Sequence, residues 1–145
     1  MLGLGNSFIT SKNRIPYIAI DEEFDSGTGG FFSSDADLSN SSGTLMVDVT
    51  ATSGYAYKAI ACAPNATFTY SIYLQSIQIG SGGGHIKIGP SSGSDDYLNV
   101  DATTGSTTYS GTFTVGDVTL FVLHLHTDVN DKWTKWDNIL IQEDN

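Results

Sequence analysis

The fold is decided by the last thirteen residues, Trp133-Thr-Lys-Trp-Asp-Asn-Ile-Leu-Ile-Gln-Glu-Asp-Asn145. They predict a closing β-strand with a buried apolar row, an acidic residue where the strand starts, and both tryptophans of the chain beside it. Trp133 and Trp136 are separated by an odd number of positions, and side chains along a strand alternate between two faces. The two rings are therefore expected to point to opposite faces, with one of them in the core.

Alternation of apolar and polar residues with a period of two recurs along the rest of the chain, whereas helical periodicity is almost absent. Clusters of Gly, Ser and Asn separate the alternating segments and predict turns. Strands are predicted at 17–24, 44–50, 56–61, 67–75, 85–88, 97–100, 107–115, 118–127 and 133–142. About 8–9 short strands with this spacing predict an all-β fold, an antiparallel two-sheet jelly-roll β-sandwich.

The chain of 145 residues is long enough for one domain with its own core. Residues 1–16, which end in Arg14-Ile-Pro16, are expected to form an extended N-terminal arm, because a proline cannot donate a hydrogen bond to a sheet. The sandwich is then expected to occupy residues 17–145. An isolated apolar arm should fray unless it docks on a neighbouring subunit. The residues predicted to dock are Leu2, Leu4, Phe8 and Ile9.

Composition excludes several classes of partner. The chain has 6 basic and 16 acidic residues and a formal net charge of −10, so it should be repelled by nucleic acids and by anionic membranes. Cys62 is the only cysteine, so no intramolecular disulfide can form. The apolar stretches are shorter than a membrane span, and the start of the chain lacks the basic residues of a secretory signal.

From about residue 17 to residue 143, the order of features resembles a carbohydrate-binding-module jelly roll of the galactose-binding-like type. The segments that carry the resemblance are the acidic strand ending at Phe24, Gly43-Thr-Leu-Met-Val47, Thr67-Phe-Thr-Tyr-Ser-Ile-Tyr73, Thr112-Phe-Thr-Val115, Val118-Thr-Leu-Phe-Val-Leu123 and Trp136-Asp-Asn-Ile-Leu-Ile141. Members of that family usually carry a tryptophan shortly after the first strand, where this chain has Phe31-Phe32. They are usually fused to enzymes, and no such partner is present here.

The resemblance implies a structural calcium between the first strand and the start of the last one. The residues concerned are Glu23, Asp25 and Asp137, whose carboxylates suit a hard cation. The alternatives are a solvated acidic edge that binds no metal, or an Asp137 side chain that forms a hydrogen bond in a turn.

Flat aromatic side chains offer surfaces on which sugar rings could stack. The candidates for glycan binding are Trp133, Trp136, Tyr55 and Tyr57. Ordinary packing or contact with another subunit explains the same residues equally well, and one of the two tryptophans is already expected in the core.

Two histidines, His124 and His126, stand two positions apart on one predicted strand and project from the same face, with Asp128 in register. Such a pair can bind zinc, nickel or copper, but a structural zinc site needs four ligands and His85 is remote in sequence. The opposite row of Phe121, Leu123 and Leu125 predicts the core face. The histidines are therefore expected to face solvent or a partner, and in a trimer they could make assembly pH-sensitive.

No constellation of catalytic residues is apparent, so the chain is not expected to be an enzyme. Its opening, Met1-Leu-Gly-Leu-Gly-Asn-Ser7, is similar to the start of bacteriophage structural proteins. The two resemblances together favour a virion structural protein, either a capsid decoration (cement) protein or a tail-fibre component. It would attach to other virion proteins through its arm and self-associate, as a trimer, within the virion. The alternative is a glycan-binding module that acts in host-receptor or polysaccharide recognition.

Overall fold

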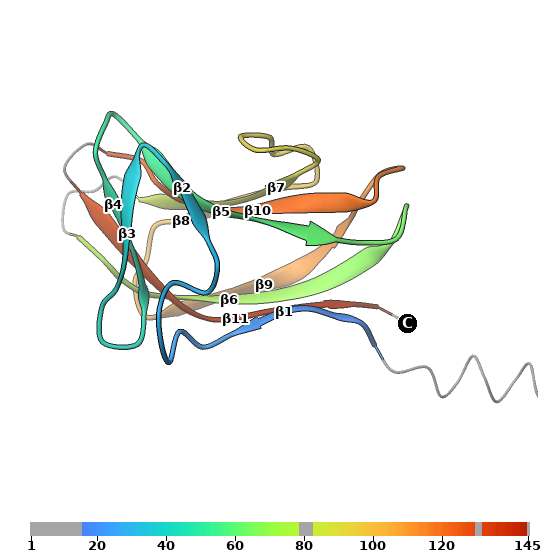
Figure 1. Cartoon of the computed structure of the whole chain (residues 1–145), viewed down its shortest axis with the longest axis horizontal. Helices are drawn as coiled ribbons and strands as arrows, with labels where there is room; N and C mark the ends of the chain where they lie inside the picture. Colours follow the sequence, from blue (N-terminus) through green and yellow to red (C-terminus); the bar gives the residue numbers. More distant parts are fainter. Residues whose placement is uncertain (1–15, 79–82, 130–131, 145) are drawn as a thin grey trace, which may run out of the picture.

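Two antiparallel sheets stack face to face in the computed structural model, which describes residues 16–78, 83–129 and 132–144 (Figure 1). The strands are β1 (Ile18–Glu22), β2 (Phe32–Ser34), β3 (Ala36–Asn40), β4 (Leu45–Val49), β5 (Gly54–Ala61), β6 (Thr67–Ile77), β7 (Gly84–Gly89), β8 (Leu98–Ala102), β9 (Thr107–Thr114), β10 (Leu120–Thr127) and β11 (Trp133–Glu143). Sheet A has the order β3-β4-β11-β6-β9, with β1 also paired to β11, and sheet B has the order β2-β5-β10-β7-β8. The predicted all-β sandwich is confirmed.

All nine predicted strands are present, and the structure adds β2 and β3. These two short strands flank Asp35, whose φ of +53° lies in the left-handed region and turns the chain from sheet B to sheet A. No helix occurs in the described part of the chain, and therefore none has the length and hydropathy of a membrane span.

The last strand, β11, organises sheet A. It pairs with β6 along one side, and on the other side it pairs first with β4 and then with β1. The register shifts between Asp137 and Leu140, where Asn138 has a φ of +46°. This bulge lets one long strand serve two partners on the same side. The first and last strands are thus neighbours, as the acidic-edge hypothesis requires.

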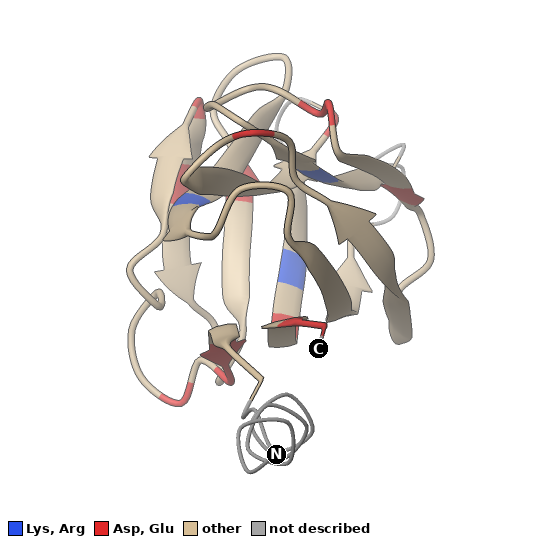
Figure 2. Ribbon diagram, turned by 90° about the vertical axis from the view of Figure 1, so that its right-hand side faces the viewer, with Lys and Arg blue, Asp and Glu red and all other residues tan. Residues whose placement is uncertain are grey.

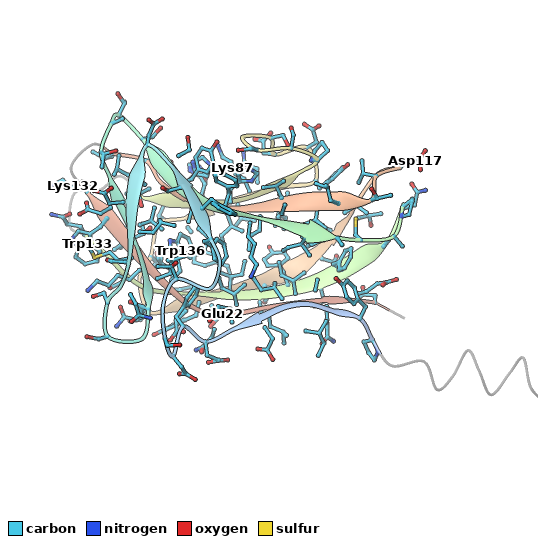
Figure 3. All side chains as sticks on the ribbon, viewed as in Figure 1. Glu22, Lys87, Asp117, Lys132, Trp133 and Trp136 are labelled. Carbon is cyan, nitrogen blue, oxygen red and sulfur yellow. The ribbon has the colours of Figure 1, made fainter. Side chains whose placement is uncertain are left out.

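The predicted division of the tryptophans is confirmed. Trp136 is 0% exposed and lies in the core, whereas Trp133 is part-exposed on the outer face of sheet A (Figure 3). The indole Nε1 of Trp136 donates to the hydroxyl of Thr134 at 2.7 Å, and that hydroxyl lies 2.7 Å from the hydroxyl of Thr127. Thr127 in turn donates to the Val47 carbonyl at 3.0 Å. The polar atom of the buried indole therefore has a partner, as burial requires.

Aromatic rings fill the space between the sheets. Phe68 and Phe113 of sheet A stack at 5.3 Å between ring centroids, and Phe121 of sheet B meets them at 5.1 and 5.3 Å. The row of Phe121, Leu123 and Leu125 points into this core, as predicted. Burying each such side chain stabilises the fold by about 1.5–3 kcal/mol. The alternation of β10 then directs His124 and His126 to the opposite, outer face of sheet B.

Candidate functional site

Two rows of side chains cross the outer face of sheet B. Strand pairing places Tyr55, His126, His85 and Asp101 side by side in one row, on β5, β10, β7 and β8. The second row consists of Phe32, Tyr57, His124, Lys87 and Asn99. Lys87 marks this face in Figure 3. All three histidines of the chain thus meet on one surface, although His85 is far from the other two in sequence.

An aromatic ledge lies at the β2–β5 side of this face and consists of Phe32, Tyr55 and Tyr57. Phe32 and Tyr57 have ring centroids 5.9 Å apart, and Tyr57 and Tyr55 have centroids 5.8 Å apart. Phe32 is 68% exposed, and the two tyrosines are part-exposed. Phe32 is held in this position by the pairing of β2 with β5, opposite Tyr57. Three rings in contact, open to solvent on one side, form an apolar surface of the kind that binds ligands.

The expectation that His124 and His126 face solvent or a partner is wrong, because other parts of the same chain cover both rings. They lie on the outer face, but they are 0% and 9% exposed. The ring of Tyr55 stacks on His126 at 4.6 Å and meets the edge of His124 at 5.3 Å. Burial lowers the pKa of His126 to about 3, and the positive charge of Lys87 adds to this effect. His126 is therefore neutral in the folded protein at physiological pH.

The second cover of this face is residues 90–96, which form most of the loop between β7 and β8 and which we call the strap. It folds back over the outer side of sheet B (Figure 1). The Gly93 amide donates to Nε2 of His124 at 2.8 Å, and the hydroxyls of Ser92 and Tyr55 lie 3.2 Å apart. Gly93 has a φ of +86°, a conformation that glycine adopts without strain. The strap is thus attached to the sheet at a histidine and at one end of the aromatic ledge.

His85 lies between two carboxylates. Its Nε2 is 2.5 Å from Asp101 Oδ1, and its Nδ1 is 2.5 Å from Asp128 Oδ2, the latter a close charge contact without hydrogen-bond alignment. Although the strands bring His85 opposite His126, no three His, Cys, Asp or Glu side chains of the described residues converge as metal ligands. His85 on β7 thus contacts a carboxylate on β8 and another just after β10, and so links the three segments.

The predicted calcium residues lie near one another at the β1–β11 end of sheet A. Desolvation, followed by the negative charges of Asp137, Asp21, Asp25 and Glu22, raises the pKa of Glu23. Within the described ranges, however, these carboxylates do not converge as a set of three ligands. Calcium binding by Glu23, Asp25 and Asp137 stays a prediction, which a melting-temperature titration with calcium would test.

Two backbone carbonyls close to this end already have a partner. The Asn40 amide donates to the carbonyls of Phe24 and Gly27 at 2.7 and 2.8 Å. The loop after β1 is therefore held by a side-chain amide.

The four aromatic residues predicted to bind glycan occupy three different places. Tyr55 and Tyr57 belong to the ledge on sheet B, whereas Trp133 lies on the opposite face of the molecule, on sheet A, with the Lys135 ammonium 4.8 Å from its ring. Trp136 is enclosed by the core and presents no ring face to a ligand, which corrects the expectation for that residue. The predicted docking residues Leu2, Leu4, Phe8 and Ile9 lie outside the described residues.

Sequence reasoning did not assign Phe32 or the strap to a site. The sequence draws attention to Phe31-Phe32 only because the resembled family usually has a tryptophan there. The strand that contains Phe32, β2, is too short to be predicted from alternation. A signal was nevertheless present, because Phe31 and Phe32 are adjacent in an extended segment and must point to opposite sides. Phe31 is in the core and Phe32 is exposed.

No protein-family model and no curated protein matches the sequence. Solved structures do match the fold. The CBM22-1–GH10 modules of Clostridium thermocellum xylanase Xyn10B, complexed with xylohexaose, share 15% identity over 90% of this chain with a TM-score of 0.66. This chain spans 29% of that structure.

Two isolated modules match over almost their whole length. The CBM22-1 xylan-binding domain of Paenibacillus barcinonensis Xyn10C shares 15% identity over 90% of this chain and 96% of its own, with a TM-score of 0.64. A family 35 carbohydrate-binding module of Clostridium thermocellum shares 12% identity over 88% of this chain and 98% of its own, with a TM-score of 0.56. Identities this low show the fold alone, and that fold is the jelly roll found in carbohydrate-binding modules.

Proposed function

We propose that this protein is a glycan-binding module whose ligand stacks on the aromatic ledge of Phe32, Tyr55 and Tyr57. The observation that carries the proposal is the contact of these three rings on one solvent-facing surface, with Phe32 68% exposed. A large aromatic ring exposed to this degree loses favourable burial unless a ligand or partner covers it. The apolar C–H face of a sugar ring is complementary to such a surface.

Polar groups beside the ledge can fix the orientation of a ligand. The Tyr55 hydroxyl lies 3.2 Å from that of Ser92. Both groups can donate and accept, as the hydroxyls of a sugar require. Lys58, the only charged residue of β5, is turned away from the ledge, and its ammonium donates to the Gly29 carbonyl at 2.7 Å. The ledge is therefore uncharged, which favours a neutral glycan.

The fold supports this proposal over the virion role that the sequence favoured. Among the similar structures, the Xyn10B modules are complexed with xylohexaose and the Xyn10C module is a xylan-binding domain. Attachment through Leu2, Leu4, Phe8 and Ile9 stays a sequence-based prediction, tested by asking whether particles recruit a chain that lacks residues 1–16.

The proposal is tested on a glycan array, followed by calorimetry with the tightest-binding oligosaccharide. We expect Tyr57→Ala and Phe32→Ala each to weaken binding by about tenfold or more, since each removes a central stacking surface. The matched control is Trp133→Ala, which removes an aromatic ring from the outer face of sheet A. A variant pattern in which Trp133→Ala abolishes binding and Tyr57→Ala does not would reject the ledge.

A further inference from the structure

The middle of the sheet B face is closed to ligands as long as the strap (residues 90–96) stays in place. The outward side chains of β10 in this region, Val122, His124 and His126, are 5%, 0% and 9% exposed. Tyr55 covers His126, and Gly93 of the strap sits on His124. A ligand on the aromatic ledge therefore meets the strap where the ledge ends, at the contact between Tyr55 and Ser92.

The contact between the strap and the sheet requires one particular form of His124. A backbone amide can only donate, so Nε2 of His124 must accept from Gly93 and carry no proton. Nδ1 lies 3.2 Å from the Lys87 carbonyl, which can only accept, so the ring proton belongs on Nδ1. The ring is thus neutral, with its proton on Nδ1. Protonation at Nε2 would set one N–H group against another and break the contact with Gly93.

The surroundings of His124 favour this neutral form. Burial, the largest influence, lowers the pKa of His124, and the positive charge of Lys87 on β7 acts in the same direction. The hydrogen bond with the Lys87 carbonyl and the negative charge of Asp95 in the strap oppose this shift. His126 on β10 and Tyr55 on β5 complete the surroundings. At neutral pH the ring is uncharged and the strap is held.

We propose that His124 is a positioning residue that holds the strap over β10 and so confines the ligand to the aromatic ledge. The inference rests on the proposed function, whose binding site it describes. With the strap closed, only a short oligosaccharide or the end of a chain fits. When the ring is protonated or replaced, the strap is released, the part of β10 around His124 is uncovered, and a longer glycan can extend beyond the ledge.

The hydrogen bond from the Gly93 amide to His124, which we call the latch, can be tested without any ligand. The measurement is amide hydrogen exchange at Gly93. In the wild-type protein at neutral pH, we expect this amide to be protected, and His124→Phe should accelerate its exchange by about fivefold or more, as loss of one hydrogen bond implies. His124→Gln should retain protection, because its amide oxygen can accept from Gly93. His126→Phe is the matched control, since Nε2 of His126 has no hydrogen-bond partner among the described residues. Unchanged exchange in His124→Phe would overturn the proposal.

The pH profile separates a latch from a general structural role. Because the pKa of His124 is lowered, protection of Gly93 should be complete near neutral pH and should be lost as the pH falls through that pKa. In His124→Gln, the protection should no longer depend on the protonation of this side chain. A His124→Gln protein with the wild-type pH profile would contradict the assignment of the latch to this ring.

Ligand length reports the effect of the strap on the site. Calorimetry with xylooligosaccharides from the disaccharide to the hexasaccharide should show affinity levelling off at a short length in the wild-type protein and rising further in His124→Phe. Gly89→Ala should have the same effect, because a Cβ at Gly89 would lie 2.6 Å from backbone atoms of Ser94 and displace the strap. Faster exchange with an unchanged length profile would overturn the role in specificity. If no variant binds any glycan of the array, the proposed function fails. The exchange rate of the Gly93 amide then still shows whether His124 holds the strap.

Discussion

At the scale of single residues, His126 shows how strongly burial changes side-chain chemistry. Its pKa falls to about 3 in the folded protein, from an ordinary value of 6.5, because the ring lies under Tyr55 and beside Lys87. A histidine that must stay neutral in the folded state binds a proton more readily when the chain unfolds. It therefore contributes to stability above pH 6.5, and the contribution is lost as the pH falls towards 3.

This residue makes the stability of the protein pH-dependent. The free energy of unfolding is expected to fall by roughly 1 kcal/mol per pH unit below 6.5 from His126 alone, with His124 adding to the slope. Urea unfolding between about pH 7 and pH 5, where model carboxylates remain mostly ionised, measures this slope. His126→Phe keeps the ring against Tyr55 and should flatten the slope. An identical slope in the wild type and in His126→Phe would contradict the assignment.

At the scale of elements, the bulge in β11 determines which strands can join sheet A. Asn138 adopts a φ of +46°, and its backbone N–H donates to Oδ1 of Asp137 at 2.8 Å. Only glycine and short polar residues adopt this conformation at low cost. The bulge therefore depends on the residue type at position 138.

Substitutions at Asn138 test this dependence. Asn138→Gly should change the free energy of unfolding by less than about 0.5 kcal/mol, whereas Asn138→Val should cost about 1–2 kcal/mol, since a β-branched residue is strained at positive φ. Leu140→Val, at an exposed position in the same strand, is the control. Equal stability of the Gly and Val variants would show that the bulge is not held in this conformation.

The elements also show where sequence reasoning succeeds. Strands such as β10 are predictable because Phe121, Leu123 and Leu125 recur at every second position on one face, and the odd spacing of the tryptophans predicts that one is buried. The exposure of His124 was mispredicted because its cover comes from the strap, a distant loop whose attachment depends on the register of β7 against β10. Likewise, Tyr55 and Tyr57 were candidates from their residue type, but Phe32 joins them only through strand pairing.

At the scale of the whole molecule, the charged side chains lie outside the aromatic ledge. The net charge is −10, and in Figure 2 the acidic residues lie mainly at loops and strand ends, with few basic residues among them. The ledge contributes no charge, so affinity for a neutral glycan should change by less than about twofold between low salt and about 0.5 M NaCl. Calorimetry at several salt concentrations measures this. A steep decline of affinity with salt would indicate that charged groups carry the binding.

Backbone amide chemical-shift mapping locates the binding surface on the protein. The protein, labelled with nitrogen-15, is titrated with the oligosaccharide that binds most tightly on the array. We predict that the perturbed amides cluster on β2 and β5, at Phe32, Tyr55 and Tyr57, and extend to Ser92 of the strap. Perturbations that cluster instead around Trp133 and Lys135 on sheet A, or none with any glycan of the array, would show that the ledge does not bind the ligand.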